Sequence, residues 1–278
     1  MIEIVDPGPF ATVQDLGRPG YARLGVPSCG AFDRGALRLA NRLVGNPPGA
    51  AAVEATLGGL TVRLLDPATI ALTGARCPGA PDWGVAVSLR AGSVVRLGAP
   101  AQGARSYLAV RGGLAVDEVL GSRSSDVLSG LGPPPLRAGD RLPVGRPTGE
   151  VSGAAAVPAA PRRALEVRFG PRDEWFAPTA RDMLVHADWT VRTHSDRVGI
   201  RLDGPRLVRL VDDELPSEPV LPGALQVPPD GRPILFGPDA PVTGGYPVLA
   251  VLAGPDDLDA AGQLRPGDSI RFVRALAP

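Results

Sequence analysis

The stretch from Leu221 to Pro247 combines polar side chains with a pair of adjacent glycines. Its possible hydrogen-bond donors and acceptors are Gln226, Asp230, Asp239, Thr243 and Tyr246. Gly244 and Gly245 lack a Cβ atom, so their backbone N–H groups can approach a ligand closely and form a concavity for an anion. The stretch therefore predicts a site that stabilises negative charge. The alternative is two hairpins whose turns need these residue types.

A second polar, glycine-rich segment runs from Thr12 to Tyr21, and its irregular pattern predicts a loop. It contains Gln14, Asp15 and Arg18, and ligand contacts often come from loops on a rigid scaffold. The alternative is an internal pair of Asp15 and Arg18 that fixes the loop. Because clefts between modules are favoured binding places, we expect this segment to line one cleft with the polar residues of the first stretch.

Arg123 lies in a third polar loop, Gly121–Asp126, among serine hydroxyls. A guanidinium group binds carboxylate or phosphate through two parallel hydrogen bonds, so Arg123 is a candidate anion clamp. The alternative is an arginine that bonds neighbouring carbonyl groups.

Several kinds of chemistry are not predicted. His194, Ser195 and Asp196 are adjacent, whereas catalytic triads assemble from distant segments. Cys29 and Cys77 lack zinc or disulfide spacing, so we expect two unpaired thiols.

All 29 basic residues are arginine, which excludes a biotinyl-lysine, a lysine Schiff base and a Walker A motif on this chain. Any biotin must be carried by another chain, and any ATP bound here must be held by arginines and backbone amides.

The bulk properties favour a soluble enzyme or binding module. The 278 residues carry a formal net charge of zero, with no basic stripe, which argues against nucleic acid or an anionic membrane as a partner. No apolar run has the length of a membrane-spanning helix, and the N-terminus has no signal-peptide pattern, so we expect a cytoplasmic protein.

Many short apolar runs between glycines and prolines predict a mainly β chain. Asp33 is a good N-cap for a helix over Arg34–Val44, whose apolar residues share one face. The main predicted strands are Ile2–Val5, Leu60–Leu65, Thr69–Thr73, Ser106–Val110, Leu165–Phe169, Ala224–Val227 and Ile234–Phe236. Short helices are expected before Met183 and over Asp256–Gln263. The predicted organisation is an N-terminal β subdomain over 1–145 with a helix near 34–44, a linker over 146–163, and a C-terminal β subdomain over 164–278.

Three segments, which begin at Leu89, Leu136 and Leu264, share a Leu-Arg turn with glycine before an alternating strand. This repetition predicts related β modules in the two halves of the chain.

The chain also resembles a known family. The motifs are Thr12–Tyr21, Gly25–Asp33, Ala36–Asn46, Gly121–Asp126, Ser195–Leu202, Ser217–Glu218, Pro222–Pro233, Asp239 and Thr243–Pro247. They are similar to motifs of the Kip-antagonist family, which includes the C subunit of bacterial 5-oxoprolinase and biotin-dependent carboxyltransferase-like proteins (allophanate hydrolase subunit 2). Cys29 and Phe32 depart from the family pattern, which has serine and methionine there.

The resemblance covers residues 2 to 273 and implies a mainly β fold with few short helices. It implies two β-barrel-like subdomains, of which the C-terminal one is cyclophilin-like. Together with the polar loops, it makes Asp15, Asp239 and Gly245 the expected catalytic residues. The expected substrate-binding residues are Gln14, Arg18, Arg123, Asp196, Arg197, Glu218, Gln226, Thr243 and Tyr246. No metal ligands are expected.

The resemblance implies one component of an ATP-dependent 5-oxoprolinase that is active only in complex. The expected partners are a Kip-inhibitor-like chain and a lactam-utilisation-like chain, and the ATP site lies in a partner or is shared with it. One alternative is a component of a biotin-dependent carboxyltransferase related to urea amidolyase. Another is a non-catalytic antagonist that binds a kinase inhibitor.

Overall fold

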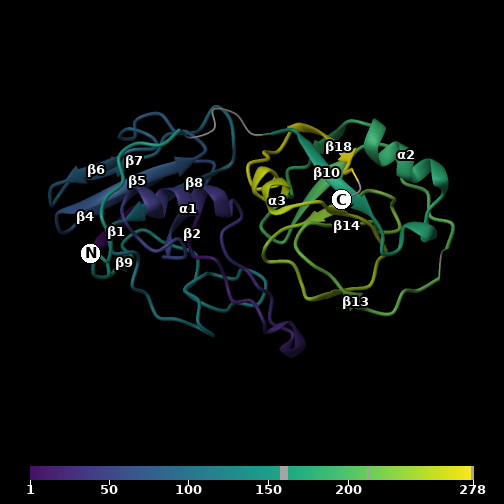
Figure 1. The fold of residues 1–278 in the computed structure, drawn as a ribbon, viewed down its shortest axis with the longest axis horizontal. Coiled ribbons are helices and arrows are strands. Elements are labelled where there is room, and N and C mark those ends of the chain that lie inside the picture. Colours follow the sequence, from purple (N-terminus) through teal and green to yellow (C-terminus); the bar gives the residue numbers. More distant parts are fainter. Residues whose placement is uncertain (157–161, 212, 277–278) are drawn as a thin grey trace. The chain divides into compact units, whose positions relative to one another are not determined.

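The computed structural model describes residues 1–156, 162–211 and 213–276 of a mainly β chain (Figure 1). Contacts between Cα atoms divide it into two units. The N-terminal unit comprises Met1–Pro19 and Cys29–Pro161, and the barrel unit comprises Gly20–Ser28 and Arg162–Pro278. The boundary at Pro161 lies within the predicted linker.

Two open sheets form the N-terminal unit. The four-stranded sheet has the order β7 (Val94–Arg96), β4 (Leu60–Leu64), β1 (Ile2–Pro7) and β9 (Arg141–Leu142). The five-stranded sheet has the order β2 (Phe10–Gln14), β3 (Ala52–Thr56), β8 (Arg105–Val110), β5 (Ala68–Gly74) and β6 (Ala86–Leu89). A β-barrel-like subdomain was expected here, and the described strands of this unit make two sheets that share one core.

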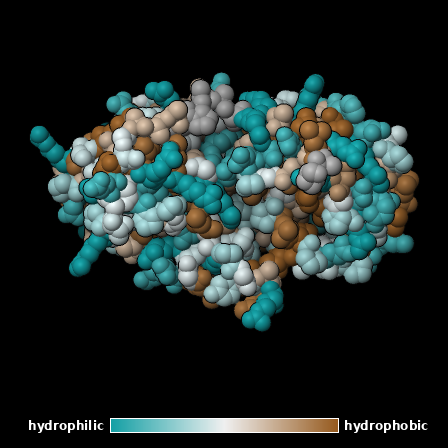
Figure 2. Space-filling model, viewed as in Figure 1, coloured by the Kyte–Doolittle hydropathy of each residue, from teal (hydrophilic) through white to brown (hydrophobic). Residues whose placement is uncertain are grey.

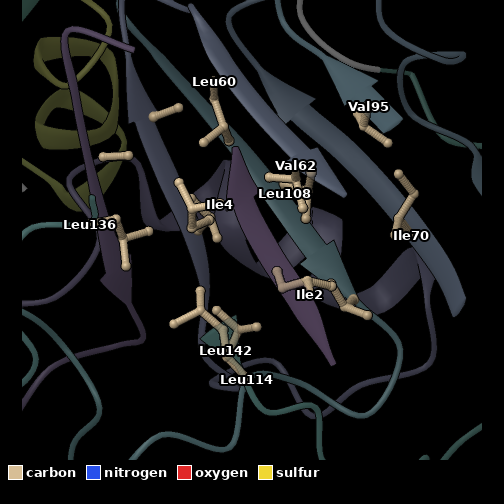
Figure 3. Packing of buried hydrophobic residues seen from close by; sticks show 14 of the residues in the cluster. Ile2, Ile4, Leu60, Val62, Ile70, Val95, Leu108, Leu114, Leu136 and Leu142 are labelled. Atoms are coloured by element: carbon tan, nitrogen blue, oxygen red, sulfur yellow. The ribbon is translucent and has the colours of Figure 1, made fainter. Parts of the chain in front are cut away.

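The core of the N-terminal unit is made of branched aliphatic side chains from both sheets. Figure 3 shows Ile2, Ile4, Leu60 and Val62 of one sheet in the same cluster as Ile70 and Leu108 of the other. Each of these side chains is at most 1% exposed. Burying such side chains is the main favourable contribution to folding, so this core fixes the sheets that carry the polar loops.

Helix α1 (Arg34–Leu43) packs against β5 and β8 and confirms the predicted helix. The Asp33 carboxylate accepts a hydrogen bond from Ala36 N at 2.7 Å, as an N-cap does. The backbone N–H of Asp33 donates to the Tyr107 hydroxyl at 2.8 Å, which in turn donates to Glu54 at 2.7 Å. Burial, and then the charge of Glu54, raise the pKa of Tyr107 well above its ordinary value, so the phenol stays a donor.

Seven strands close into a barrel in the other unit. Their order is β10 (Ala164–Phe169), β17 (Val248–Leu252), β14 (Ala224–Gln226), β15 (Ile234–Phe236), β12 (Gly199–Asp203), β11 (Trp189–Val191) and β18 (Ser269–Arg274). The unit also contains a ribbon of β13 (Glu218–Pro219) with β16 (Thr243–Gly244), helices α2 (Pro178–His186) and α3 (Pro255–Ala261), and two 3-10 turns, η1 (Ala22–Leu24) and η2 (Asp173–Trp175). The closed barrel agrees with the expected C-terminal fold.

Two segments differ from their predictions. Thr12 and Gln14 were expected in a loop, but they belong to strand β2, which pairs residue by residue with β3. The early part of the predicted linker is bonded to the N-terminal unit, because Ser152 N donates to Leu43 O and Ala155 N donates to Gly84 O. Residues 157–161 of that linker lie outside the described part of the chain.

The three repeated turns have the same backbone. In each, the N–H of Ser93, Asp140 or Asp268 donates to the carbonyl of the arginine three residues earlier. The intervening Gly92, Gly139 and Gly267 have φ values of 80°, 92° and 86°, which glycine adopts without strain. The shared motif is therefore a turn that precedes a strand, used in both units.

Figure 2 shows apolar and polar residues interspersed on one face of the molecule. None of the helices in the described residues is long and apolar enough to cross a membrane.

Candidate functional site

Asp15 is the centre of a hydrogen-bond network that joins two loops of the N-terminal unit. Its carboxylate accepts hydrogen bonds from Gly17 N at 2.7 Å, Ser122 Oγ at 2.7 Å, Ser124 Oγ at 2.6 Å and Arg123 N at 2.6 Å. Its own N–H donates to Ser124 Oγ at 2.8 Å. Four donors on one buried carboxylate make a strong structural link. The expected catalytic role of Asp15 remains a prediction.

Gln14 lies at the end of β2, beside the same serine loop. Its amide Nε2 donates to Thr12 Oγ1 and to the Ser125 carbonyl, both at 3.0 Å. The Cys29 thiol reaches the same Ser125 carbonyl, with an Sγ–O distance of 2.9 Å. Cys29 and Cys77 are buried and form no disulfide in the described residues, as expected.

Arg18 is 1% exposed and lies against the same loop. Its Nε donates to the Val119 carbonyl at 3.2 Å, and its Nη2 donates to the Ser124 carbonyl. In the described residues, these carbonyl contacts take the place of the Asp15–Arg18 ion pair that was the alternative prediction. The guanidinium is therefore anchored along one edge only.

Three buried polar atoms in this region have no protein partner. They are Gln14 Oε1, Arg18 Nη1 and Ser125 Oγ. A buried polar atom without a partner costs about 1–3 kcal/mol, so most are satisfied in folded proteins. Their concentration around one loop indicates a ligand or ordered water there. We call these three residues the polar trio.

Arg123 has partners within its own part of the chain. Its Nε donates to the Val116 carbonyl at 2.8 Å, and its Nη1 lies 2.7 Å from a carboxylate oxygen of Glu118. This arrangement matches the alternative of an arginine that bonds neighbouring carbonyls. An incoming anion would have to compete with Glu118 for the guanidinium.

Arg197 and Asp239 form a buried ion pair in the barrel unit. Arg197 Nε donates to Asp239 Oδ2 at 2.9 Å and Nη2 donates to Oδ1 at 2.8 Å. Their side chains are 2% and 0% exposed. The anion beside Arg197 is thus the carboxylate of Asp239, and each group neutralises the other. Asp196 accepts hydrogen bonds from Val198 N and Gly199 N, a turn-forming role.

Four of the expected substrate-binding residues come together around the β13–β16 ribbon. In this ribbon Glu218 pairs with Gly244, and Pro219 pairs with Thr243. Gln226 Nε2 donates to the Tyr246 carbonyl at 2.9 Å. An added Cβ at Gly244 would lie 2.5 Å from Gln226 Nε2, so Gln226 lies directly against the ribbon.

Glu218 has an ion-pair partner that was not predicted. Arg172 Nε lies 3.1 Å from each carboxylate oxygen of Glu218, and Nη2 also donates to Glu218. These hydrogen bonds from Arg172 lower the pKa of Glu218 below its ordinary value. No local pattern linked the two residues, which are 46 positions apart.

Gly244 and Gly245 differ in the space around them. A Cβ at Gly245 would meet only Leu215 O, at an ordinary contact distance of 3.7 Å. Neither glycine has a positive φ. The closest approach is therefore at Gly244 and not at Gly245, where it was expected. The expected oxyanion role of Gly245 remains a prediction.

Sequence reasoning missed the contribution of the serines at 122, 124 and 125. They were noted only as surroundings of Arg123, although hydroxyl-rich loops supply donors for a nearby carboxylate. The expected site residues fall in both units, and the expectation that they line one cleft stays a prediction.

Comparisons with known proteins place the chain among related sequences. Residues 24–274 match the family described as "Carboxyltransferase domain, subdomain A and B". The 5-oxoprolinase C subunit of Escherichia coli (strain K12) is 41% identical over 286 residues, which cover 99% of this chain and 91% of that protein. The corresponding protein of Haemophilus influenzae is 34% identical and covers 98% of this chain and 90% of that protein. A crystal structure of the K. lactis urea amidolyase has a TM-score of 0.88 and 29% identity, and covers 98% of this chain but 18% of that one.

Proposed function

Because the chain belongs to the carboxyltransferase-domain family with subdomains A and B, we propose that it is the C subunit of a 5-oxoprolinase. The proposed reaction converts 5-oxoproline, ATP and water to glutamate, ADP and phosphate. The observation that carries this proposal is 41% identity to the E. coli 5-oxoprolinase C subunit across 91% of its length.

The chemistry explains why such a reaction needs ATP. An unactivated lactam resists attack by water, and phosphorylation of its oxygen makes the ring carbon more electrophilic. Water then adds to this carbon, the C–N bond breaks to open the ring, and hydrolysis of the resulting acyl phosphate releases phosphate. The site then needs a group to activate water, donors for the developing oxyanion and a cation for the substrate carboxylate. The buried polar loops of this chain offer donors of this type. The chain has no lysine and no Walker A motif, which supports an ATP site in a partner or shared with it.

The proposed partners are a Kip-inhibitor-like chain and a lactam-utilisation-like chain, in the cytoplasm. Two relatives are named as one lettered subunit of 5-oxoprolinase, which supports an enzyme of several different chains. Both expected catalytic carboxylates are engaged by donors of this chain, which supports contributions from a partner.

A second candidate function is carboxyl transfer from biotin carried on another chain. The family description and the similarity to urea amidolyase support it. In this case the polar loops would bind the ureido ring of the cofactor and the acceptor amide. No residue of this chain can carry biotin covalently, because it has no lysine.

Co-expression with the two candidate partners tests the proposal. The purified complex should hydrolyse ATP only when 5-oxoproline is present and should release glutamate. The matched control is the same complex supplied with urea and a carrier protein whose biotin has been carboxylated. Transfer of carboxyl to urea without 5-oxoproline turnover would favour the second function. A complex without either activity would favour the antagonist.

A further inference from the structure

We propose that the polar trio, Gln14, Arg18 and Ser125, binds the cis-amide edge of a lactam substrate, where N–H and C=O lie side by side. This inference rests on the proposed function for the identity of the lactam. It adds a subsite and assigns a role to Ser125, which was not among the expected site residues.

The open atoms of the trio define the ligand that satisfies them. Arg18 Nη1 is a charged donor that requires an oxygen acceptor, and Gln14 Oε1 is an acceptor that requires a donor. Ser125 Oγ can serve as either. A ligand with one acceptor and one donor on the same edge satisfies the set, and a lactam has both in a fixed cis arrangement.

The orientation of the Gln14 amide is fixed by its surroundings. Its Nε2 lies 3.0 Å from the Ser125 carbonyl oxygen, which can only accept a hydrogen bond. Exchanging the amide N and O would place two oxygens in contact. Oε1 is therefore the free atom, and it faces its ligand as an acceptor.

Hydrogen bonds to neighbouring carbonyl groups hold the Arg18 guanidinium in place. Arg18 donates through Nε to Val119 and through Nη2 to Ser124, so the direction of Nη1 is set. Gly132 has a φ of 79°, and a Cβ there would lie 3.1 Å from Arg18 Nη2. Arg18 is thus held by neighbouring carbonyls, and Gln14 is held by Thr12 and by the Ser125 carbonyl within the trio.

A purely structural role does not explain Ser125. Among the described residues, it is the serine whose hydroxyl is buried without a partner, and Gln14 is the glutamine with such an amide oxygen. Ser125 is only 1% exposed. Without a ligand this hydroxyl is a cost to folding, and an alanine would fill nearly the same space.

Ser125→Ala in the assembled complex is the primary test. We expect the KM for 5-oxoproline to rise about tenfold, the loss typical of one hydrogen bond to a ligand. The melting temperature should stay the same or increase, because an unpaired buried hydroxyl is removed. The control is Ser124→Ala, which loses bonds to Asp15 and should lower the melting temperature.

A binding measurement separates this inference from the proposed function. If the wild-type complex shows no 5-oxoproline turnover, the proposed function fails, and 2-pyrrolidone binding to the full chain, followed by NMR, then decides the inference. The wild type should bind 2-pyrrolidone about tenfold more tightly than Ser125→Ala does. N-methyl-2-pyrrolidone, which lacks the N–H, should bind both chains equally weakly. An unchanged KM, or equal binding of the two lactams by the wild type, would show that the trio holds ordered water and would overturn the inference.

Discussion

Gly244 and Gly245 are adjacent, yet substitution at each should have a different effect. Alanine at Gly245 meets only an ordinary contact, so Gly245→Ala should unfold at the wild-type temperature. Alanine at Gly244 would push the Gln226 amide from its bond to the Tyr246 carbonyl, at a cost of about 1–3 kcal/mol of unfolding free energy. Thermal denaturation of both variants measures this difference.

Turnover of the same two variants tests the expected oxyanion role. Loss of an oxyanion donor lowers kcat by roughly a hundredfold or more. Gly245→Ala keeps the backbone N–H, so a loss of this size with normal melting would mean that the added methyl blocks the approach of the substrate to this N–H. Normal melting with normal turnover would show that the substrate does not approach the backbone on the side of the added methyl.

Substitution of Asp15 tests whether its role is structural or catalytic, because the two roles predict different changes in stability and turnover. Asp15→Ala leaves four donors without their acceptor, so we expect a loss of unfolding free energy on the order of 3 kcal/mol. Asp15→Asn keeps one acceptor oxygen and should lie between the alanine variant and the wild type. Urea denaturation measures both. Wild-type stability of Asp15→Ala with lost turnover would favour the catalytic role.

The polar residue types could be identified in the sequence, but their partners could not. Arg197 and Asp239 are 42 positions apart and were assigned separate roles, whereas the structure pairs them. Such pairings depend on which strands become neighbours, here β12 and β15 near the two residues. A linear pattern contains no information on this choice, so the partner of Arg197 could not be predicted.

Strands and helices were predicted where local signals agree. The helix after Asp33 has a capping residue, an apolar face and a glycine just beyond its end, and its observed bounds differ by one residue. Strand β2 was missed because Thr12 and Gln14 are polar. Both are fully buried, and β3 supplies the partner that makes them a strand. Tertiary pairing outweighed local propensity there.

The link between β13 and the segment after β10 should depend on pH. Hydrogen bonds from Arg172 lower the pKa of Glu218 from its ordinary 4.5. The stabilisation is therefore fully present above pH 4.5 and is lost as the pH falls through the lowered value. Between about pH 5.5 and about pH 3, the free energy of unfolding should decrease less in Glu218→Gln than in the wild type. Chemical denaturation at several pH values measures this difference. The pair is partly exposed, so the effect is small and decreases with salt.

Arg172→Gln provides the control for this pair. In that background, Glu218→Gln should have no further effect on the pH dependence, because the partner that lowers the pKa is gone. An equal effect of Glu218→Gln with and without Arg172 would show that the charge of Glu218 acts through other groups.

Turns and strand patterns predicted a linker rich in glycine, proline and alanine over 146–163, between two β subdomains. In the structure, the first unit ends at Pro161 and the second resumes at Arg162. The assignment of Gly20–Ser28 to the barrel unit was not predicted, because such a grouping depends on contacts distant in sequence. The N-terminal unit was expected to be a β-barrel-like subdomain, and its described strands form two sheets. Strand patterns alone do not distinguish a closed barrel from two packed layers.

The purified chain alone should not turn over 5-oxoproline. Its two expected catalytic carboxylates are occupied, since Asp15 accepts four hydrogen bonds and Asp239 is paired with Arg197. A general base must be free to take a proton from water, so we expect a further group from a partner. We expect glutamate release to begin only when the Kip-inhibitor-like and lactam-utilisation-like partners are added to the isolated chain. The mixture of the two partners without this chain is the control and should also be inactive. Full turnover by the chain alone would show that one of these carboxylates leaves its partners during catalysis and would contradict the requirement for a complex.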